Sequence, residues 1–370
     1  MTRLDGLYLD YGQSAWVDNI RRDWLNDGTL QSLVDRGVRG VTSNPSIFAK
    51  AVATTPAYDS IIAELGLSDP EEAFEALAVA DVQDACRILR PVYDASVREF
   101  AAGTRRSTDG YVSLEVSPRL AHDTEGTIAA ARSLAARVGD HPNVMIKIPA
   151  TQAGLPAISA VLGEGISVNV TLIFSLERYR QVLDAFVAGM HLAAANGRDL
   201  SAIGSVASFF ISRVDTAIDP LLPTDSLLRG TIANAQAAAA YQTFIEHSAS
   251  APMSELITSG SQIQRPLWAS TSTKNPAYDE LLYVDTLAAP ETVNTMPDPT
   301  LEAFASSGDP SRSALANEHS RLILARNLNE LANVGISLGD VTDTLERDGV
   351  AAFVTSYDEL LQTVAGKLQR

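Results

Sequence analysis

The chain has 370 residues, of which 46% are hydrophobic and 20% are charged, and its formal net charge is −17 at pH 7. This composition is typical of a globular enzyme with enough material for one large barrel or two medium-sized domains. The strong negative charge argues against a general surface for nucleic acid or anionic membranes, but it leaves room for a small basic pocket.

The single cysteine, Cys86, excludes an internal disulfide and fits a reducing compartment. It lies in a helical pattern among apolar residues, so we expect a small core residue rather than a nucleophile. The sequence contains no N-terminal apolar segment of the secretory kind and no apolar run of about 18 residues. We therefore expect no membrane partner and a cytoplasmic location.

Strand-like and helix-like segments alternate along the chain. We predict strands at 13–19, 37–45, 111–116, 144–148, 167–174, 202–212 and 266–271, and an eighth at either 283–285 or 293–296. Helical patterns occupy 21–36, 56–66, 70–102, 124–137, a segment beginning near Gly154, 175–196, 228–247, 311–333 and 344–368. Pro45 is expected to terminate the second strand.

This alternation, without any break in composition, predicts an α/β fold with a single (β/α)8 TIM barrel domain over residues 1–370 and additional C-terminal helices. An open doubly wound sheet is the alternative, but no Gly-x-Gly-x-x-Gly follows any predicted strand. The C-terminal helices within 311–368 either cover the barrel or form an interface, and the sequence pattern does not choose between these. It does not give the oligomeric state either.

One lysine stands out because Val144–Ile148 is otherwise apolar and reads as a buried strand with Lys147 in its middle. A buried amine without a partner favours its neutral form, which is the nucleophile of Schiff-base chemistry. The alternative is a lysine at a strand end that reaches solvent or pairs with a carboxylate. This stretch alone supports both interpretations equally.

Polar residues recur at or near the C-terminal ends of the predicted strands, which meet at one mouth of a barrel. They are Asp18, Thr42, Asn44, Glu115, Lys147, Asn169, Thr171, Ser208 and Arg213. Individual members have structural explanations: Asp18 could cap a helix, and Asn44 could be a turn residue. Thr171 could be a β-branched core residue, and Glu115 could pair with Arg119. A coincidence of all of them at one mouth is much less plausible.

The chemistry suggests a division of roles. Glu115, with Thr171, could hold a water for proton transfer at the lysine, and Asp18 could be the base for carbon–carbon cleavage. Thr42, Asn44 and Asn169 offer donors for sugar hydroxyls. Farther along the chain, Arg213 and Lys274 could clamp a terminal phosphate, with Ser270 adding a hydroxyl; ordinary surface charge is the alternative for the two cations.

Other chemistries find less support. The five histidines are scattered, with no His-x-x-x-His spacing, so the sequence predicts no metal site. There is also no Gly-x-Ser-x-Gly elbow and no Walker loop.

With these residues assembled, the chain resembles transaldolases, in particular the longer form found in many bacteria. The segments that support the resemblance are 40–48, 113–120, 145–151, 167–175, 205–213 and 267–276, which include Thr42-Ser43-Asn44-Pro45, Ser113-Leu114-Glu115-Val116 and Ile146-Lys147-Ile148-Pro149. They lie in family order over most of the chain and together are highly specific.

The resemblance implies a class I aldolase-type barrel with Lys147 as the Schiff-base nucleophile on strand four. It implies transfer of a dihydroxyacetone unit from sedoheptulose 7-phosphate to glyceraldehyde 3-phosphate, in the non-oxidative pentose phosphate pathway, without a metal or organic cofactor. By position, Asp18 matches the acid/base aspartate, and Glu115 and Thr171 match the pair that holds the catalytic water. Thr42, Asn44, Asn169 and Ser208 match substrate-contacting positions, and Arg213 matches a phosphate ligand.

One departure affects the phosphate site, because shorter relatives place an arginine after strand seven where this chain has Ser272 and then Lys274. The main rival is a fructose 6-phosphate aldolase, which releases free dihydroxyacetone. That relative has a glutamine in place of Glu115 and a tyrosine in the pocket where this chain offers Phe210. A catalytically silent barrel that only binds sugar phosphates is a further alternative, but Lys147, Asp18 and Glu115 are all present.

Overall fold

The computed structural model describes residues 2–369. Seven strands within this range form one curled parallel sheet in the order β1-β7-β6-β5-β4-β3-β2. They are β1 (Gln13–Val17), β2 (Val112–Glu115), β3 (Val144–Pro149), β4 (Val168–Ile173), β5 (Ser205–Phe210), β6 (Gln264–Ala269) and β7 (Thr292–Met296). Nearly every strand residue is buried, as is typical of a parallel sheet with both faces covered.

The two outer strands of the sheet, β1 and β2, both reach the segment around Val41. Val41 forms parallel bridges with Val17 and with Val112. Its N–H donates to the Tyr111 carbonyl at 2.9 Å, and the Thr42 N–H donates to the Val17 carbonyl at 2.9 Å. In place of the strand predicted at 37–45, the structure has an isolated bridge at Val41 with a few backbone hydrogen bonds on either side of it.

The reason for the short pairing is the helix that follows directly. Pro45 does not terminate a strand but begins helix α4 (Pro45–Thr54), and Asn44 caps that helix. Pro is favoured at the first position of a helix, where its missing N–H costs nothing. The chain therefore leaves the sheet two residues after the bridge at Val41.

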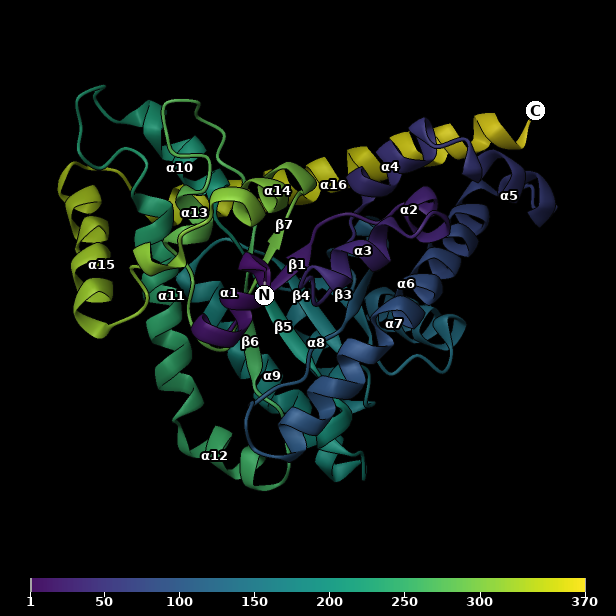
Figure 1. Ribbon diagram of the computed structural model, residues 1–370, viewed down its shortest axis with the longest axis horizontal. Coiled ribbons are helices and arrows are strands. Elements are labelled where there is room, and N and C mark those ends of the chain that lie inside the picture. The colour runs from purple at the N-terminus through teal and green to yellow at the C-terminus, as the bar shows by residue number, and fades with distance from the viewer. Residues whose placement is uncertain (1, 370) are drawn as a thin grey trace.

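Helices cover the sheet, as Figure 1 shows. In addition to α4, they are α1 (Arg3–Tyr11), α2 (Arg22–Asn26), α3 (Thr29–Asp35), α5 (Ala57–Leu65), α6 (Pro70–Ala101), α7 (Thr124–Val138), α8 (Gly154–Gly163), α9 (Leu176–Ala195), α10 (Ser212–Ile218), α11 (Ile232–Ser248), α12 (Ala251–Thr258), α13 (Leu282–Asp285), α14 (Asp298–Ser307), α15 (Glu318–Asn333) and α16 (Leu338–Leu368). The last helix, α16, runs across the end of the molecule at which β7 ends (Figure 1).

Most of the other predicted elements are confirmed, but some boundaries differ. The helix predicted at 21–36 is divided into α2 and α3, because Gly28 adopts a left-handed φ of 83° between them. Of the two candidates for the last strand, 283–285 lies in the helix α13 and 293–296 lies in β7. The helix predicted at 344–368 begins earlier, at Leu338, and the one predicted at 311–333 begins later, at Glu318.

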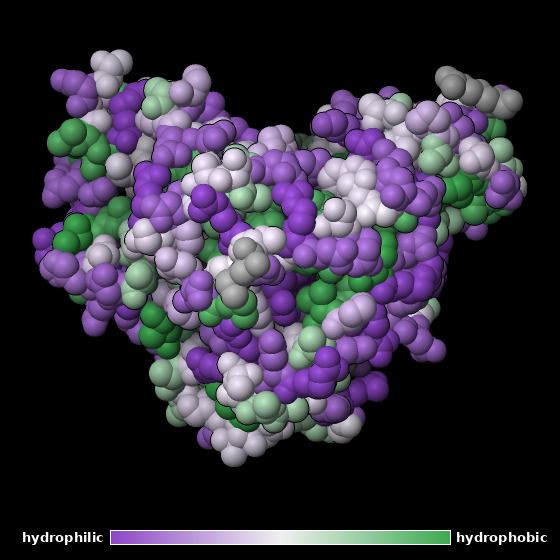
Figure 2. All heavy atoms as spheres, viewed as in Figure 1, coloured by the Kyte–Doolittle hydropathy of each residue, from purple (hydrophilic) through white to green (hydrophobic). Residues whose placement is uncertain are grey.

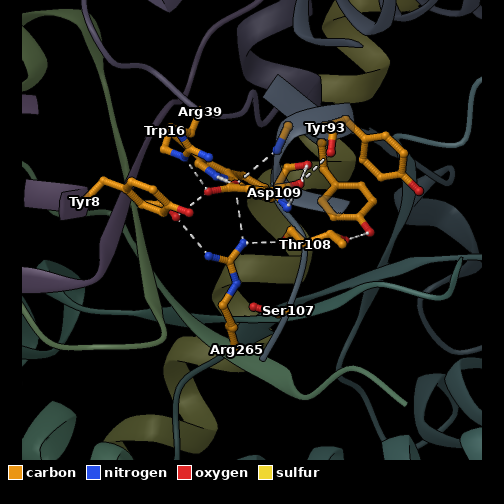
Figure 3. A network of polar contacts seen from close by, with 12 residues as sticks. Tyr8, Trp16, Arg39, Tyr93, Ser107, Thr108, Asp109 and Arg265 are labelled. Atoms are coloured by element: carbon orange, nitrogen blue, oxygen red, sulfur yellow. Dashed lines mark hydrogen bonds and ion pairs between the residues drawn. The ribbon is translucent and has the colours of Figure 1, made fainter. Parts of the chain in front are cut away.

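A buried network of charged and polar side chains closes the amino-terminal end of the sheet (Figure 3). Asp109, before β2, accepts hydrogen bonds from Ser14, from Trp16 Nε1 at 2.8 Å and from Arg39 Nε at 2.9 Å. Arg265 of β6 lies 3.3 Å from the same carboxylate. Burial raises the pKa of Asp109, but the guanidiniums of Arg265 and Arg39 more than offset it and hold the pKa below its usual range.

The surface seen in Figure 2 is mainly hydrophilic, with small apolar patches between charged groups. Cys86 is fully buried and burial raises the pKa of its thiol to about 12, which agrees with the predicted core residue. None of the helices in residues 2–369 combines the length and the apolar character needed to cross a membrane.

Candidate functional site

A cavity of about 150 Å³ opens at the carboxyl ends of the strands. Its lining includes nine residues that the sequence singled out: Asp18, Thr42, Asn44, Lys147, Thr171, Ser208, Arg213, Ser270 and Lys274. Glu115 and Asn169 lie beside it, in contact with residues of the lining. The structure thus brings all the predicted site residues together at one mouth, as parallel strands in a curled sheet do.

Lys147 lies at the closed end of this cavity and is only 5% exposed. Its Nζ donates to the main-chain carbonyl of Ser43 at 3.0 Å and lies 3.3 Å from Glu115 Oε2. The register of the sheet explains the pair, because Glu115 of β2 lies directly beside Lys147 of β3. A parallel sheet points such neighbours to the same face.

Glu115 is buried with Lys147, and its partner is not the one that the structural alternative suggested. Arg119 instead pairs with Asp358 at 2.7 Å, so the Glu115–Arg119 pair is wrong. Burial raises the pKa of Glu115 to about 7, although the charge of Lys147 acts in the opposite direction. A carboxyl group with such a pKa exchanges protons readily at neutral pH.

Asp18 follows β1, and two threonine hydroxyls form a hydrogen-bonded chain that ends at its carboxylate. Thr42 Oγ1 lies 2.6 Å from Asp18 Oδ1 and also 2.6 Å from Thr295 Oγ1. Burial raises the pKa of Asp18, while Lys147 and the bond from Thr42 lower it. Asp18 does not cap the next helix, since the N-cap of α2 is Arg21, so that alternative is also wrong.

Asn169 links a serine of β2 to a serine of β5. It is adjacent to Lys147 in the sheet register. Its Nδ2 donates to Ser113 Oγ at 2.9 Å, and its Oδ1 accepts from Ser208 Oγ at 2.7 Å. Ser208 reaches the cavity, whereas Asn169 is fully buried, so Asn169 holds Ser208 in place.

Thr171 reaches the cavity at an irregularity of β4. The pairing of β4 with β5 shifts between Val170 and Ile173, and Leu172 adopts a φ of 60°, which is unusual for a branched residue. Such bulges redirect side chains next to functional sites. Thr171 Oγ1 is buried and has no hydrogen-bond partner within the described residues, so it is available to a ligand or water in the cavity.

Asn44 has a structural role and also faces the cavity. Its Oδ1 accepts from the Ile47 N–H at 3.0 Å, which caps α4. With the carbonyl oxygen committed to the cap, the amide Nδ2 is the group left to donate to a ligand. The interpretation of Asn44 as a simple turn residue is thereby replaced by a helix cap.

The open end of the cavity is positively charged. Arg213 is half-buried against the ring of Phe210, and burial lowers its pKa; no carboxylate within residues 2–369 pairs with it. Lys274 is exposed, and its Nζ lies 2.6 Å from Ser272 Oγ. Ser270 adopts a left-handed φ of 56°, which places strain at this end, and its hydroxyl lies 3.0 Å from that of Ser212.

Comparison with known proteins adds an independent observation. The family model described as "Transaldolase/Fructose-6-phosphate aldolase" matches residues 15–364. A protein of Thermobifida fusca named transaldolase is 49% identical over 367 residues, which cover 97% of this chain and 96% of that protein. Transaldolases of Parafrankia sp. (47%, 96% of each chain) and Mycobacterium leprae (48%, 96% of this chain and 94% of that protein) are similarly close. The chain belongs to the transaldolase/fructose-6-phosphate aldolase family.

Three further residues that the sequence did not indicate lie at the site. Thr295 lies at the end of β7 and could have been found by its position at a strand end. Asp298, which raises the pKa of Asp18, follows the same strand. Phe353 also lines the cavity, but it comes from α16, and no local motif indicated it.

Proposed function

We propose that this chain is a transaldolase that moves a dihydroxyacetone unit from sedoheptulose 7-phosphate to glyceraldehyde 3-phosphate, giving erythrose 4-phosphate and fructose 6-phosphate. The observation that supports this best is the buried Lys147–Glu115 pair at the closed end of a cavity whose other end has cations. The relatives named transaldolase, 47–49% identical to this chain, point the same way.

In the first step, the neutral amine of Lys147 adds to the C2 carbonyl of the ketose. The carbinolamine then loses water and becomes an iminium. Both changes need a proton carrier, and Glu115 lies 3.3 Å from Nζ with a pKa of about 7. Thr171, whose hydroxyl is free of other partners among the described residues, would hold a water together with Glu115.

In the second step, the C3–C4 bond breaks, which is one bond removed from the iminium carbon C2. The iminium accepts the electron pair, and the hydroxyl at the far side of the breaking bond must lose its proton. Asp18 is the proposed base, because it lines the cavity and its raised pKa suits the return of the proton to the acceptor aldehyde. Thr42 donates to the carboxylate and is itself held by Thr295.

The remaining polar groups would bind the substrate. Asn44 and Ser208 present donors for the sugar hydroxyls, with Asn169 behind Ser208. At the open end, Arg213, Ser270 and Lys274 would hold the terminal phosphate. A half-buried guanidinium favours an anionic ligand because burial without a counter-charge is costly.

The alternative within the family is an aldolase that releases dihydroxyacetone. Glu115 and Phe210, rather than glutamine and tyrosine, favour the transferase. A silent sugar-phosphate-binding protein would not need the acid/base groups Asp18 and Glu115 next to Lys147.

We further infer that the sheet closes as a (β/α)8 barrel, with the segment around Val41 as the eighth strand. Its hydrogen bonds to Val17 and Tyr111, on either side, support this closure. A single domain over residues 1–370 is supported by one hydrophobic cluster that extends from Leu4 to Val364. A cytoplasmic location and a lack of nucleic-acid partners remain part of the proposal and rest on the single buried Cys86 and the net charge of −17.

Borohydride trapping tests the mechanism. The enzyme would be incubated with fructose 6-phosphate, reduced, and mapped by peptide mass spectrometry. We expect a reduced three-carbon adduct on the peptide that contains Lys147, and none with Lys147→Ala. No adduct, or an adduct on another lysine, would overturn the assignment. Omission of the acceptor aldehyde then separates a transaldolase from an aldolase, because only the latter releases dihydroxyacetone at an appreciable rate.

A further inference from the structure

The C-terminal helix α16 is part of the wall around the lysine. Phe353, on this helix, lines the same cavity as Lys147, and its ring centroid lies 5.7 Å from Lys147 Nζ. Both side chains are buried. Phe353 belongs to an apolar cluster with Phe174, which follows β4, and Phe210, which ends β5.

The sequence of α16 brings its backbone close to the sheet at this point. Gly349 lies one turn before Phe353 and therefore on the same face of the helix. A Cβ at Gly349 would lie 3.2 Å from the ring of Phe174 and 3.3 Å from Leu172, so a side chain there would press on these neighbours. The glycine thus lets α16 pack closely against the residues beside Phe353.

Polar contacts hold α16 on both sides of Phe353. Before it, Glu346 pairs with Arg178 at 3.3 Å. After it, the Tyr357 hydroxyl donates to Glu71 at 2.8 Å, and Asp358 pairs with Arg119. These anchors keep the ring in a fixed position over the amine.

We propose that Phe353 shields the covalent three-carbon intermediate from water and so acts with Glu115 and Phe210 to favour transfer of the unit over its release. This inference rests on the proposed transaldolase function. It assigns to α16 the role of a cover, which the sequence left undecided between cover and interface.

The chemistry of release explains why such a shield matters. After cleavage, the unit remains on Lys147 as an enamine, and the leaving aldehyde vacates its part of the cavity. Release requires a proton on the enamine carbon, which gives an iminium; water then adds to the imine carbon, and the C–N bond breaks to return dihydroxyacetone and the free amine. Transfer instead forms a carbon–carbon bond from the same enamine carbon to the acceptor aldehyde.

Phe353 opposes release by excluding water. Its apolar ring, 5.7 Å from Lys147 Nζ, limits the water that can enter the vacated space, which is a general means of suppressing side reactions. Less water at the imine carbon and at the enamine carbon lengthens the life of the covalent adduct.

The test compares two rates in four proteins: the parent, Phe353→Ala, Phe353→Leu and Val364→Ala. One rate is dihydroxyacetone release from fructose 6-phosphate alone, and the other is transfer from fructose 6-phosphate to erythrose 4-phosphate. We expect the ratio of release to transfer to rise about tenfold in Phe353→Ala, the size of change that a modest loss of barrier height produces. Phe353→Leu, which keeps an apolar side chain, should give a smaller rise.

Val364→Ala is the matched control, because Val364 is fully buried on the same helix but does not line the cavity. It should lower thermal stability without changing the ratio. An unchanged ratio in Phe353→Ala, or an equal rise in Val364→Ala, would overturn the inference. If Phe353→Ala does not fold, an unchanged ratio of release to transfer in Phe353→Leu would overturn the inference instead. A parent enzyme without transfer activity would instead contradict the proposed function.

Discussion

At the scale of single residues, the site combines groups that are each ordinary in isolation. Burying a charged lysine or a charged glutamate alone costs free energy. Side by side, the opposite charges of Lys147 and Glu115 offset part of that cost, and the two groups can exchange a proton. The raised pKa values of Glu115 and Asp18 have the same first cause, which is burial. Burial therefore tunes the acid/base groups as well as excluding solvent.

The pKa of Glu115 predicts the pH dependence of the reaction. As a proton acceptor, Glu115 must be ionised, so kcat/KM should fall as the pH is lowered through about 7. Glu115→Gln should lose this acidic limb and reduce kcat by about 100-fold. A series of kcat/KM measurements from acid to alkaline pH checks this.

The exposed Glu302, which pairs with Arg36 at 2.8 Å, offers a matched control. Glu302→Gln should leave the pH profile unchanged. If Glu115→Gln keeps the acidic limb of the parent, the proton carrier is another group.

At the scale of elements, some residues both shape the backbone and present a side chain to the cavity. Asn44 is the clearest case, since one amide oxygen caps α4 and the other end of the amide faces the cavity. The bulge after Val170 does the same for Thr171. Structural and functional demands thus coincide at the same positions.

Two substitutions separate the roles of Asn44. Asn44→Ser keeps a capping oxygen but loses the amide donor, whereas Asn44→Ala loses both. We expect kcat/KM to fall about five- to tenfold in both variants, as for one neutral hydrogen bond. Only Asn44→Ala should lose about 1 kcal/mol of unfolding free energy. Urea unfolding and steady-state kinetics give the two quantities, and equal stability of the two variants would show that the cap contributes little.

At the scale of the whole molecule, the two ends of the sheet differ in structure. The carboxyl end has the cavity, and the amino end is closed by the Asp109 network (Figure 3). That network also fastens the N-terminal helix α1, because the Arg39 guanidinium lies 3.6 Å from the ring centroid of Tyr8. Stability and chemistry are therefore spatially separated.

Asp109→Asn should destabilise the protein without affecting the acidic limb of kcat/KM. The substitution leaves Arg265 and Arg39 without their buried counter-charge, which costs about 3–5 kcal/mol. Because the folded-state pKa of Asp109 is depressed, its contribution is present above the unfolded value of about 3.9 and is lost as the pH falls through the folded value. Denaturant unfolding at pH 7 and at acid pH measures both effects.

The exposed Arg36–Glu302 pair again provides the comparison, since its loss should cost less than about 1 kcal/mol. A similarly small cost for Asp109→Asn would mean that the network does not stabilise the fold.

The sequence by itself determined the α/β alternation and most of the strands, because hydrophobic period and turn residues are local properties. It also determined the candidate site residues, since a lysine inside an apolar strand and polar residues at strand ends are visible without coordinates. Parallel strands bring such ends together in almost any curled sheet. The predicted site therefore assembled at one mouth of the structure.

Only the tertiary structure decided which residues touch. It paired Glu115 with Lys147 instead of Arg119 and reduced the segment around Val41 to a bridge. It also chose 292–296 as the last strand and brought Phe353 to within 5.7 Å of a lysine more than two hundred positions earlier. These contacts depend on how helices and strands distant in sequence pack together, and no local period encodes that packing.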